Sequence, residues 1–255
     1  MTRRQALSLS ALALPGLSSS ASAQFRAIVP QGGRPQKRGP ASGLPFNAKF
    51  TNVAKAAGLT APVIFGDEGH ADYILDSLGC GVAFLDYDND GWQDILLLTG
   101  RRRHSPNPAG ATIRLYHNNR DGTFRDVTAQ SGLGRRDIWA LGVTIADYDN
   151  DGFDDIFVTC YGQNILFHND GKGVFSDVTG KAGLLHPGDR LATGCTWIDY
   201  DRNGLLDLFV THYVVFDTAK IPARAATKAC TWKDVPVYCG PLGLPYESAR
   251  LYRNN

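Results

Sequence analysis

Short apolar runs separated by acidic or glycine-containing turns dominate the chain after residue 80. VAFL at 82–85 and DILLL at 94–98 flank one such turn, IRLYH follows at 113–117, and TFRDV closes the group at 123–127. Runs of this length, bounded by Asp, Asn and Gly, predict short β-strands joined by tight turns. The first two runs are apolar on both faces, which indicates a sheet packed between two neighbours.

This arrangement occurs three times along the chain. The acidic turns begin at Asp86, Asp147 and Asp199, so they lie 61 and then 52 residues apart. A period of this size predicts stacked supersecondary units such as propeller blades. We therefore expect an all-β fold, a β-propeller built from four-stranded antiparallel blades. The expected blades span residues 81–127, 142–178 and 194 onward.

Two further copies of the repeat are partial. The phrase RLYRNN at 250–255 matches only the start of RLYHNNRDGTF, and FTNVAKAAGL from Phe50 matches only the fourth strand, FRDVTAQSGL from Phe124. We therefore expect an incomplete propeller, about half of a ring, and a chain that is the N-terminal fragment of a longer protein. The Phe50 strand is expected to lie unpaired or on a neighbouring edge.

Each acidic turn presents oxygen atoms at the spacing of calcium loops. In DYDNDGWQD, acidic residues stand at positions 1, 3, 5 and 9, and a backbone carbonyl is available at position 7. Hard oxygen ligands at these positions favour Ca²⁺. The glutamate at position 12 and the following helix of an EF-hand are missing, so the loop is expected within a β-hairpin. The alternative is a metal-free turn, because Asp, Asn and Gly favour turns anyway.

The three copies supply one expected ligand set each. These sets are Asp86, Asp88, Asp90, Trp92 and Asp94; Asp147, Asp149, Asp151, Phe153 and Asp155; and Asp199, Asp201, Asn203, Leu205 and Asp207. Asn203 replaces a carboxylate by a neutral oxygen, so the third site is expected to bind most weakly. Without metal the clustered carboxylates would repel one another. We therefore expect about three Ca²⁺ ions, each pinning the hairpin that opens a blade.

The combined motifs resemble a known family. The DYDNDGxxD turns followed by LYxNNxDGTFxDVT phrases are similar to FG-GAP/VCBS repeats, and GCGVAFLDYDNDGWQDILLLTG with CTWKDVPVYCGPLGLP resembles the ASPIC/UnbV-associated, cartilage-acidic-protein-like family. The resemblance covers residues 46–255. It implies a β-propeller, usually of seven blades, with calcium in the hairpin loops. It implies no known reaction.

The first 23 residues are expected to be a signal peptide and not part of the fold. Arg3 and Arg4 precede an apolar run at 6–17 and the small residues Ala21-Ser22-Ala23, the three-part pattern of an export signal. TRRQAL also resembles a twin-arginine signal, without deciding between the Tat and Sec routes. We expect export to the periplasm or the extracellular space, a Pro/Gly-rich linker at 24–45, and the partial propeller at 46–255. The other segments are too short or too polar to span a membrane.

Export changes the interpretation of the five cysteines. Cys230 and Cys239 bracket the short loop CTWKDVPVYC, and an oxidising compartment favours a disulfide between them over two free thiols. Cys80, Cys160 and Cys195 lie in or beside apolar runs, where cysteine usually packs as a small hydrophobe.

The remaining features favour a binding module. The formal net charge is +1, so we expect no nucleic-acid partner. Long loops opposite the acidic turns carry arginines, and loops on a rigid scaffold are common binding sites, although the arginines could simply be solvated. They are Arg101, Arg102, Arg103, Arg135, Arg136 and Arg190.

Catalytic motifs are scarce in the sequence. His117 and His168 share one repeat position that Arg253 fills in the third copy, which favours a structural or surface role over a catalytic one. No hydrolase or phosphate-binding motif is present. We therefore expect a non-catalytic exported calcium-binding module for a protein or polysaccharide ligand. The alternative is an exported propeller-type enzyme, a glycan hydrolase or lyase.

Overall fold

The computed structural model describes most of the chain after residue 48. The described ranges are 49–69, 71–104, 110–135, 138–221, 230–241 and 244–255. The chain divides into two units, residues 1–50 and 51–255, and every strand reported below belongs to the second. The expected signal peptide and linker, and Arg136, lie outside the described residues.

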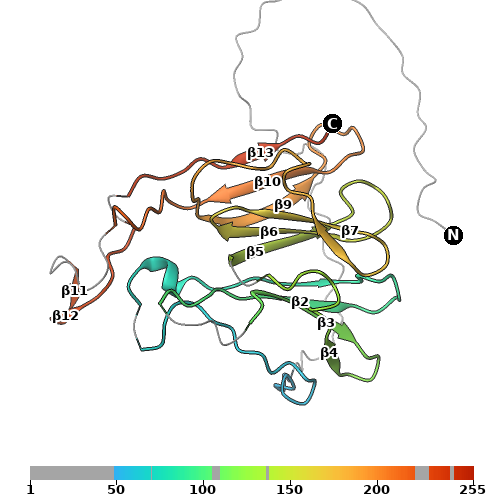
Figure 1. The fold of residues 1–255 in the computed structure, drawn as a ribbon, viewed down its shortest axis with the longest axis horizontal. Coiled ribbons are helices and arrows are strands. Elements are labelled where there is room, and N and C mark those ends of the chain that lie inside the picture. The colour runs from blue at the N-terminus through green and yellow to red at the C-terminus, as the bar shows by residue number, and fades with distance from the viewer. Residues whose placement is uncertain (1–48, 70, 105–109, 136–137, 222–229, 242–243) are drawn as a thin grey trace, which may run out of the picture. The chain divides into compact units, whose positions relative to one another are not determined.

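Three antiparallel sheets follow one another along the chain (Figure 1). The first contains β1 (Val82–Leu85), β2 (Asp94–Leu98), β3 (Ile113–Asn118) and β4 (Phe124–Asp126). The second contains β5 (Trp139–Ala146), β6 (Asp155–Tyr161), β7 (Ile165–Asn169) and β8 (Phe175–Asp177). The third contains β9 (Ala192–Ile198), β10 (Asp207–His212) and β13 (Arg250–Tyr252). The first two sheets pair their strands in chain order, which confirms the expected all-β fold of four-stranded antiparallel sheets.

Apolar side chains fill the spaces between successive sheets. Leu96 and Leu98 of the first sheet share a buried cluster with Ile156 and Val158 of the second. The opposite face of the second sheet places Phe157 in a cluster with residues of the third sheet, including Leu208 and Val210. Both faces of β6 are therefore buried, as its unbroken apolar sequence predicts.

A glycine at the start of each of the first two sheets lets neighbouring first strands approach closely. A Cβ atom on Gly81 would lie 3.0 Å from the Leu141 carbonyl oxygen, and one on Gly142 would lie 2.7 Å from the Thr193 carbonyl oxygen. Any larger residue would push the sheets apart, so these positions favour glycine for contact reasons.

The outward faces of the first and third sheets remain exposed. Val82 and Phe84 on β1 are 59% and 63% exposed. On the far face of the third sheet, Ile198, Phe209 and Leu251 are also exposed. These side chains occupy positions that are buried or partly buried between sheets elsewhere in the repeat.

A long insertion separates β10 from β13. It contains the short hairpin of β11 (Thr231–Trp232) and β12 (Val235–Pro236), and a disulfide joins Cys230 to Cys239 at the base of this hairpin. One 3₁₀ helix, η1 (Ile74–Ser77), precedes the first sheet. Within the described residues no helix is long and apolar enough to cross a membrane.

Candidate metal centres

The acidic loops join the first two strands of each sheet through the same backbone path. The fourth loop position is left-handed in all three copies: Asn89, Asn150 and Arg202 have φ values of 53°, 60° and 61°. The glycine at position 6 also has positive φ, for example 86° at Gly91. Asn and Gly tolerate this conformation best, so the repeated sequence selects the loop shape.

The first aspartate of each loop holds the turn closed. The Asp86 carboxylate accepts hydrogen bonds from the amides of Asp90 and Gly91, both at 2.9 Å. Asp147 accepts the equivalent bonds at 2.9 and 3.0 Å, and Asp199 at 3.0 and 3.1 Å. These contacts preorganise the loop around the remaining carboxylate oxygens.

The last aspartate of each loop is fully buried between strands. Asp94 accepts from the amides of Asn118 at 2.7 Å and Tyr87 at 3.3 Å, and Asp155 and Asp207 make the corresponding contacts. Burial raises the pKa of Asp94 to about 6. Burial likewise raises the pKa of Asp155 to about 6. Buried carboxylates of this kind favour a neutralising partner.

Carboxylate oxygens of each loop gather within 4.8 Å of one another. The groups are Asp86, Asp88 and Asp94; Asp147, Asp149 and Asp151; and Asp199, Asp201 and Asp207. Asp90 joins Asp88 and His117 in a further group, and Asp155 joins Asp149 and His168. The structure thus brings the expected carboxylates together in all three loops.

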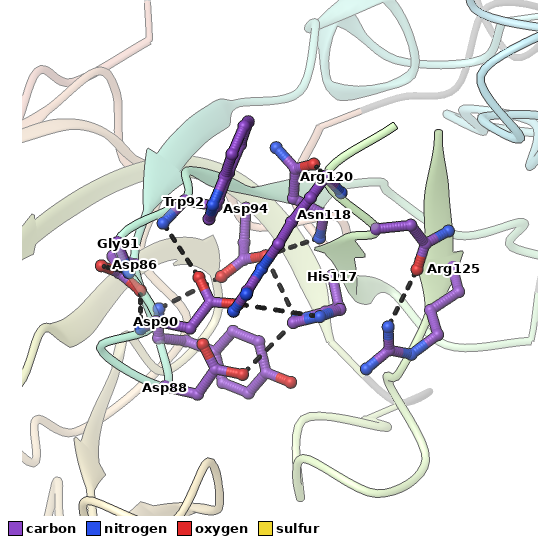
Figure 2. A network of polar contacts seen from close by, with 12 residues as sticks. Asp86, Asp88, Asp90, Gly91, Trp92, Asp94, His117, Asn118, Arg120 and Arg125 are labelled. Carbon is purple, nitrogen blue, oxygen red and sulfur yellow. Dashed lines mark hydrogen bonds and ion pairs between the residues drawn. The ribbon is translucent and has the colours of Figure 1, made fainter. Parts of the chain in front are cut away.

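At the first loop, one oxygen of the loop and one nitrogen of the adjoining strand β3 lack a hydrogen-bond partner although both are buried. They are Oδ1 of Asp88 and Nδ1 of His117. His117 is 8% exposed, and its Nδ1 lies 3.4 Å from Asp88 and 3.5 Å from Asp94 (Figure 2). An unsatisfied buried donor or acceptor is destabilising. A cation bound among these atoms would satisfy them, so the residues fit a metal ion.

The sequence did not predict that the histidines lie against the carboxylates of these clusters. The Tyr87 and His117 rings pack edge to face with their centroids 5.9 Å apart, and Tyr148 and His168 make the same contact at 6.3 Å. Nδ1 of His168 lies 3.3 Å from both Asp149 and Asp155. The available signal was the repeat position that the two histidines share, one residue before the repeated Asn whose backbone amide donates to the last aspartate.

Arginines also enter two of the clusters, and they differ between copies. Arg120 donates to Asp90 at 2.7 Å and lowers the pKa of that carboxyl. Gly171 occupies the Arg120 position in the second repeat. In the third repeat Arg253 replaces the histidine and lies 2.8 Å from Asp201. The second loop therefore carries no arginine at either of these two repeat positions.

Neighbouring loops are hydrogen-bonded to one another across the sheet boundaries. The side-chain amide of Asn89 donates to the Gly152 carbonyl at 3.0 Å, and that of Asn150 donates to the Gly204 carbonyl at 3.3 Å. A metal ion that fixes one loop would therefore also restrict its neighbour.

The carbonyl ligands expected at Trp92, Phe153 and Leu205 remain predictions. Asn203 uses its side-chain oxygen to accept from the Leu205 amide at 2.7 Å. Asp90 and Asp151 accept from the equivalent amides at 2.9 Å. Asn203 thus keeps the loop geometry of its acidic counterparts while it removes one charge.

A family model described as FG-GAP-like repeat matches residues 86–158 and 147–210. The chain contains FG-GAP-like repeats. The two matched segments each run from one acidic loop into the second strand of the following sheet. They therefore follow the same period as the loop clusters and the sheets.

Two groups of curated proteins share part of this sequence. Integrin alpha-6 of Homo sapiens is 29% identical over 164 residues, which are 61% of this chain and 14% of the integrin. Cartilage acidic protein 1 of Mus musculus is 33% identical over 86 residues, which are 33% of this chain and 13% of that protein. The chain spans only a small part of the length of either relative.

The arginines opposite the acidic loops of the FG-GAP-like repeats mostly pair with acidic side chains. Arg102 pairs with Glu68, Arg190 pairs with Glu247, and Arg135 lies 3.3 Å from Asp177. These acidic partners offset much of the positive charge that the arginines were expected to give to the face opposite the acidic loops.

Arg103 is packed against aromatic rings. Its guanidinium lies over the rings of Tyr73 and Trp139, at 4.7 and 5.0 Å from their centroids, and donates to Asp76 at 2.9 Å. This arrangement fixes η1 to the second sheet, which gives Arg103 a structural role.

A groove of about 450 Å³ lies on the same face. Its lining includes Arg101, Trp139, Tyr161, Gln163 and Asp189. These residues combine apolar rings with groups of both charges, so the groove can accept a polar ligand.

Proposed function

We propose that this chain is an exported, non-catalytic calcium-binding β-propeller module that binds a protein or polysaccharide through the loops opposite its metal sites. The observation that carries the proposal is the same carboxylate cluster at three hairpins of one repeat. Export rests on the signal-like N-terminus. The ligand class rests on the mixed polar and aromatic groove.

Calcium is the cation that suits the oxygen-rich part of each cluster. Asp86, Asp88 and Asp94 offer carboxylate oxygens within 4.8 Å of one another, and Ca²⁺ takes several carboxylate ligands in flexible geometry. The ion supplies positive charge where like charges would otherwise repel. Its role is to lock β1 to β2, and the same holds for the corresponding hairpins of the other sheets.

Calorimetric titration of the full chain with Ca²⁺ tests this proposal. Asp149→Asn removes a central carboxylate of the second loop and should abolish or strongly weaken one class of sites. Asp121→Asn is the matched control, because the Asp121 carboxylate accepts from Thr123 in its own turn and, among the described residues, belongs to none of the metal-binding clusters. Heat of binding that is unchanged by Asp149→Asn, or the same loss in both variants, would contradict the proposal.

The ligand surface has its own test. Binding of the calcium-loaded chain to an array of neutral and acidic polysaccharides is expected, and Gln163→Ala should weaken it because Gln163 lines the groove. Asn119→Ala, on the acidic-loop face, is the control. Retention of full binding in the Gln163 variant would exclude the groove as the ligand site.

A further inference from the structure

An imidazole nitrogen faces the carboxylates of the first acidic loop. Nδ1 of His117 lies 3.4 Å from Oδ2 of Asp88 and 3.5 Å from Oδ1 of Asp94 (Figure 2). In the second loop, Nδ1 of His168 lies 3.3 Å from each of the two corresponding carboxylates. Both loops therefore bring together the carboxylates of loop positions 3 and 9 and one nitrogen atom.

These nitrogen atoms are buried and have no hydrogen-bond partner. This holds for Nδ1 of His117 and of His168, and equally for Oδ1 of Asp88. The His117 side chain is only 10% exposed, so water reaches it poorly. A buried polar atom without a partner is destabilising. A cation shared with the carboxylates would satisfy the nitrogen and the oxygen together.

The spacing of these atoms fits shared coordination better than direct hydrogen bonding. A charge-assisted N–H···O bond is about 2.7–2.9 Å long, and all four nitrogen–oxygen distances are longer than that. Two ligands bound at about 2.0–2.1 Å to one tetrahedral ion lie about 3.3–3.4 Å apart. The four distances lie close to this second spacing.

Strand pairing holds the nitrogen and its carboxylates in place. His117 lies on β3, and the edge-to-face contact with Tyr87 orients its ring. The next residue on β3, Asn118, donates its amide to Asp94 at 2.7 Å. The second sheet repeats both contacts. The donor atoms are therefore carried by rigid elements, as a preorganised metal centre requires.

The third loop differs in the residue that takes the place of the histidine. Arg253 occupies this repeat position, and its guanidinium lies 2.8 Å from Oδ2 of Asp201. A guanidinium has no lone pair to offer a metal ion, and its charge repels a cation. The third loop is therefore left with oxygen ligands, so the chain contains its own contrast to the first two loops.

The nitrogen changes which ions suit the first two loops. Ca²⁺ takes oxygen ligands, whereas imidazole suits zinc, copper, iron and nickel. In the first loop Arg120 already pairs with Asp90, which lowers the number of oxygen atoms available to calcium. The nitrogen of His117 offsets this loss for an ion that accepts both nitrogen and oxygen.

We propose that the first two acidic loops accept a first-row divalent transition ion, for which Zn²⁺ is the probe, with the histidine as a direct ligand. The inference shares with the proposed function the premise that these loops hold a cation, and it adds the selectivity of two of them. The third loop takes oxygen-coordinated ions alone. The two ligand sets are His117, Asp88 and Asp94, and His168, Asp149 and Asp155.

The transition ion and Ca²⁺ exclude one another at each of these loops. Asp88 and Asp94 belong both to the histidine set and to the oxygen-rich cluster with Asp86. One carboxylate pair cannot serve two separate ions of this charge without strong repulsion between them. Zn²⁺ should therefore displace Ca²⁺ from two loops and leave the third loaded with calcium.

Calorimetric titration of the full, chelator-treated chain with Zn²⁺ provides the first measurement. The parent chain should bind two equivalents more tightly than any others. His117→Gln and His168→Gln should each weaken one of these sites by about 10–100-fold, at least the effect of losing an outer-shell partner. His104→Gln is the matched control, because the His104 side chain is 69% exposed and belongs to no metal-binding cluster among the described residues.

The converse variant adds a site and does not depend on a loss of binding. Arg253→His places an imidazole at the third loop and removes the guanidinium beside Asp201. It should raise the number of tight Zn²⁺ sites from two to three. Retained calcium binding by each variant shows that it is folded. A third loop that gains no Zn²⁺ affinity in this variant would overturn the inference.

Calcium titration of the same variants separates this inference from the proposed function. Because imidazole is not a ligand for Ca²⁺, both histidine variants should keep calcium affinity within about threefold of the parent chain. Calcium binding with Zn²⁺ affinity that responds to neither histidine overturns the inference and leaves the proposed function standing. Zn²⁺ binding through both histidines in a chain that takes up no Ca²⁺ supports the inference and overturns the calcium proposal. Equal losses of Ca²⁺ and Zn²⁺ affinity in the histidine variants would show that the rings only support the loops, and would overturn the inference.

Discussion

At the scale of single residues, the acidic loops were predictable because their chemistry is local. Asp, Asn and Gly at fixed offsets determine both the loop conformation and the oxygen donors, and the structure gathers the expected carboxylates. The approach of His117 and Arg120 was not predictable in the same way. Both lie in or just after β3, and only the pairing of β2 with β3 brings them beside Asp90 and Asp94.

The second loop is predicted to bind Ca²⁺ more tightly than the first. Arg120 lies 2.7 Å from Asp90 and competes with a cation there, whereas the second repeat has Gly171 at that position. Arg120→Gly should raise the affinity of the first loop only modestly, since solvent screening leaves an exposed ion pair with a small contribution. Calcium titration checks this, with Arg125→Gly as the control; an unchanged or lower affinity would contradict it.

The metal-free chain is predicted to lose stability as the pH rises through about 6. Burial raises the pKa of Asp94 and Asp155 from 3.8 to about 6. A carboxyl group with a raised pKa in the folded chain adds stability that is complete below pH about 4 and is lost as the pH passes the folded pKa. Urea unfolding in a chelating buffer at pH 5 and pH 7 measures this. Asp94→Asn with Asp155→Asn should flatten the difference, and greater stability at pH 7 in the parent chain would contradict the account.

At the scale of elements, the period of the sequence predicted the strands and their pairing within each sheet. Short apolar runs between acidic and glycine turns leave no room for crossover helices, so consecutive runs must pair antiparallel. The insertion between β10 and β13 was not predictable in detail, because its sequence has no repeat counterpart. The place of η1 beside Arg103 and Trp139 likewise depends on contacts distant in sequence.

Gly142→Ala is predicted to destabilise the chain more than Gly194→Ala. A methyl group at position 142 would lie 2.7 Å from the Thr193 backbone oxygen, whereas one at 194 would meet only the Thr211 hydroxyl, at 2.8 Å. A side-chain hydroxyl can rotate away and a backbone carbonyl cannot, so Gly142→Ala should cost about 1–3 kcal/mol. Urea unfolding of both variants measures the difference, and equal midpoints would show that the first strands of adjacent sheets can separate freely.

The Cys230–Cys239 disulfide is predicted to form when the chain is expressed with export to an oxidising compartment. Peptide mapping without reductant should recover the two residues in one linked fragment, while Cys160, which is buried, should remain unlinked to either. Recovery of both 230 and 239 as alkylated free thiols after export would show that the hairpin of β11 and β12 forms without the bridge.

At the scale of the second unit, three sheets share their apolar faces and their loops are joined by hydrogen bonds. Buried clusters couple each sheet to the next, and Asn89 and Asn150 join successive acidic loops. The stacking was predictable from runs that are apolar on both faces. The close approach at Gly142 was not predictable in this way, because it depends on the three-dimensional arrangement.

Thermal unfolding of the full chain with calcium and with a chelator tests most directly the claim that metal ions lock the hairpins. A ligand that binds only the folded chain stabilises it by RT ln(1 + [L]/Kd), about 2.7 kcal/mol at a hundredfold excess over Kd for one site. The account predicts a midpoint several degrees higher in calcium, and a smaller shift when Asp88→Asn and Asp149→Asn are combined. Identical unfolding curves in calcium and chelator would contradict it.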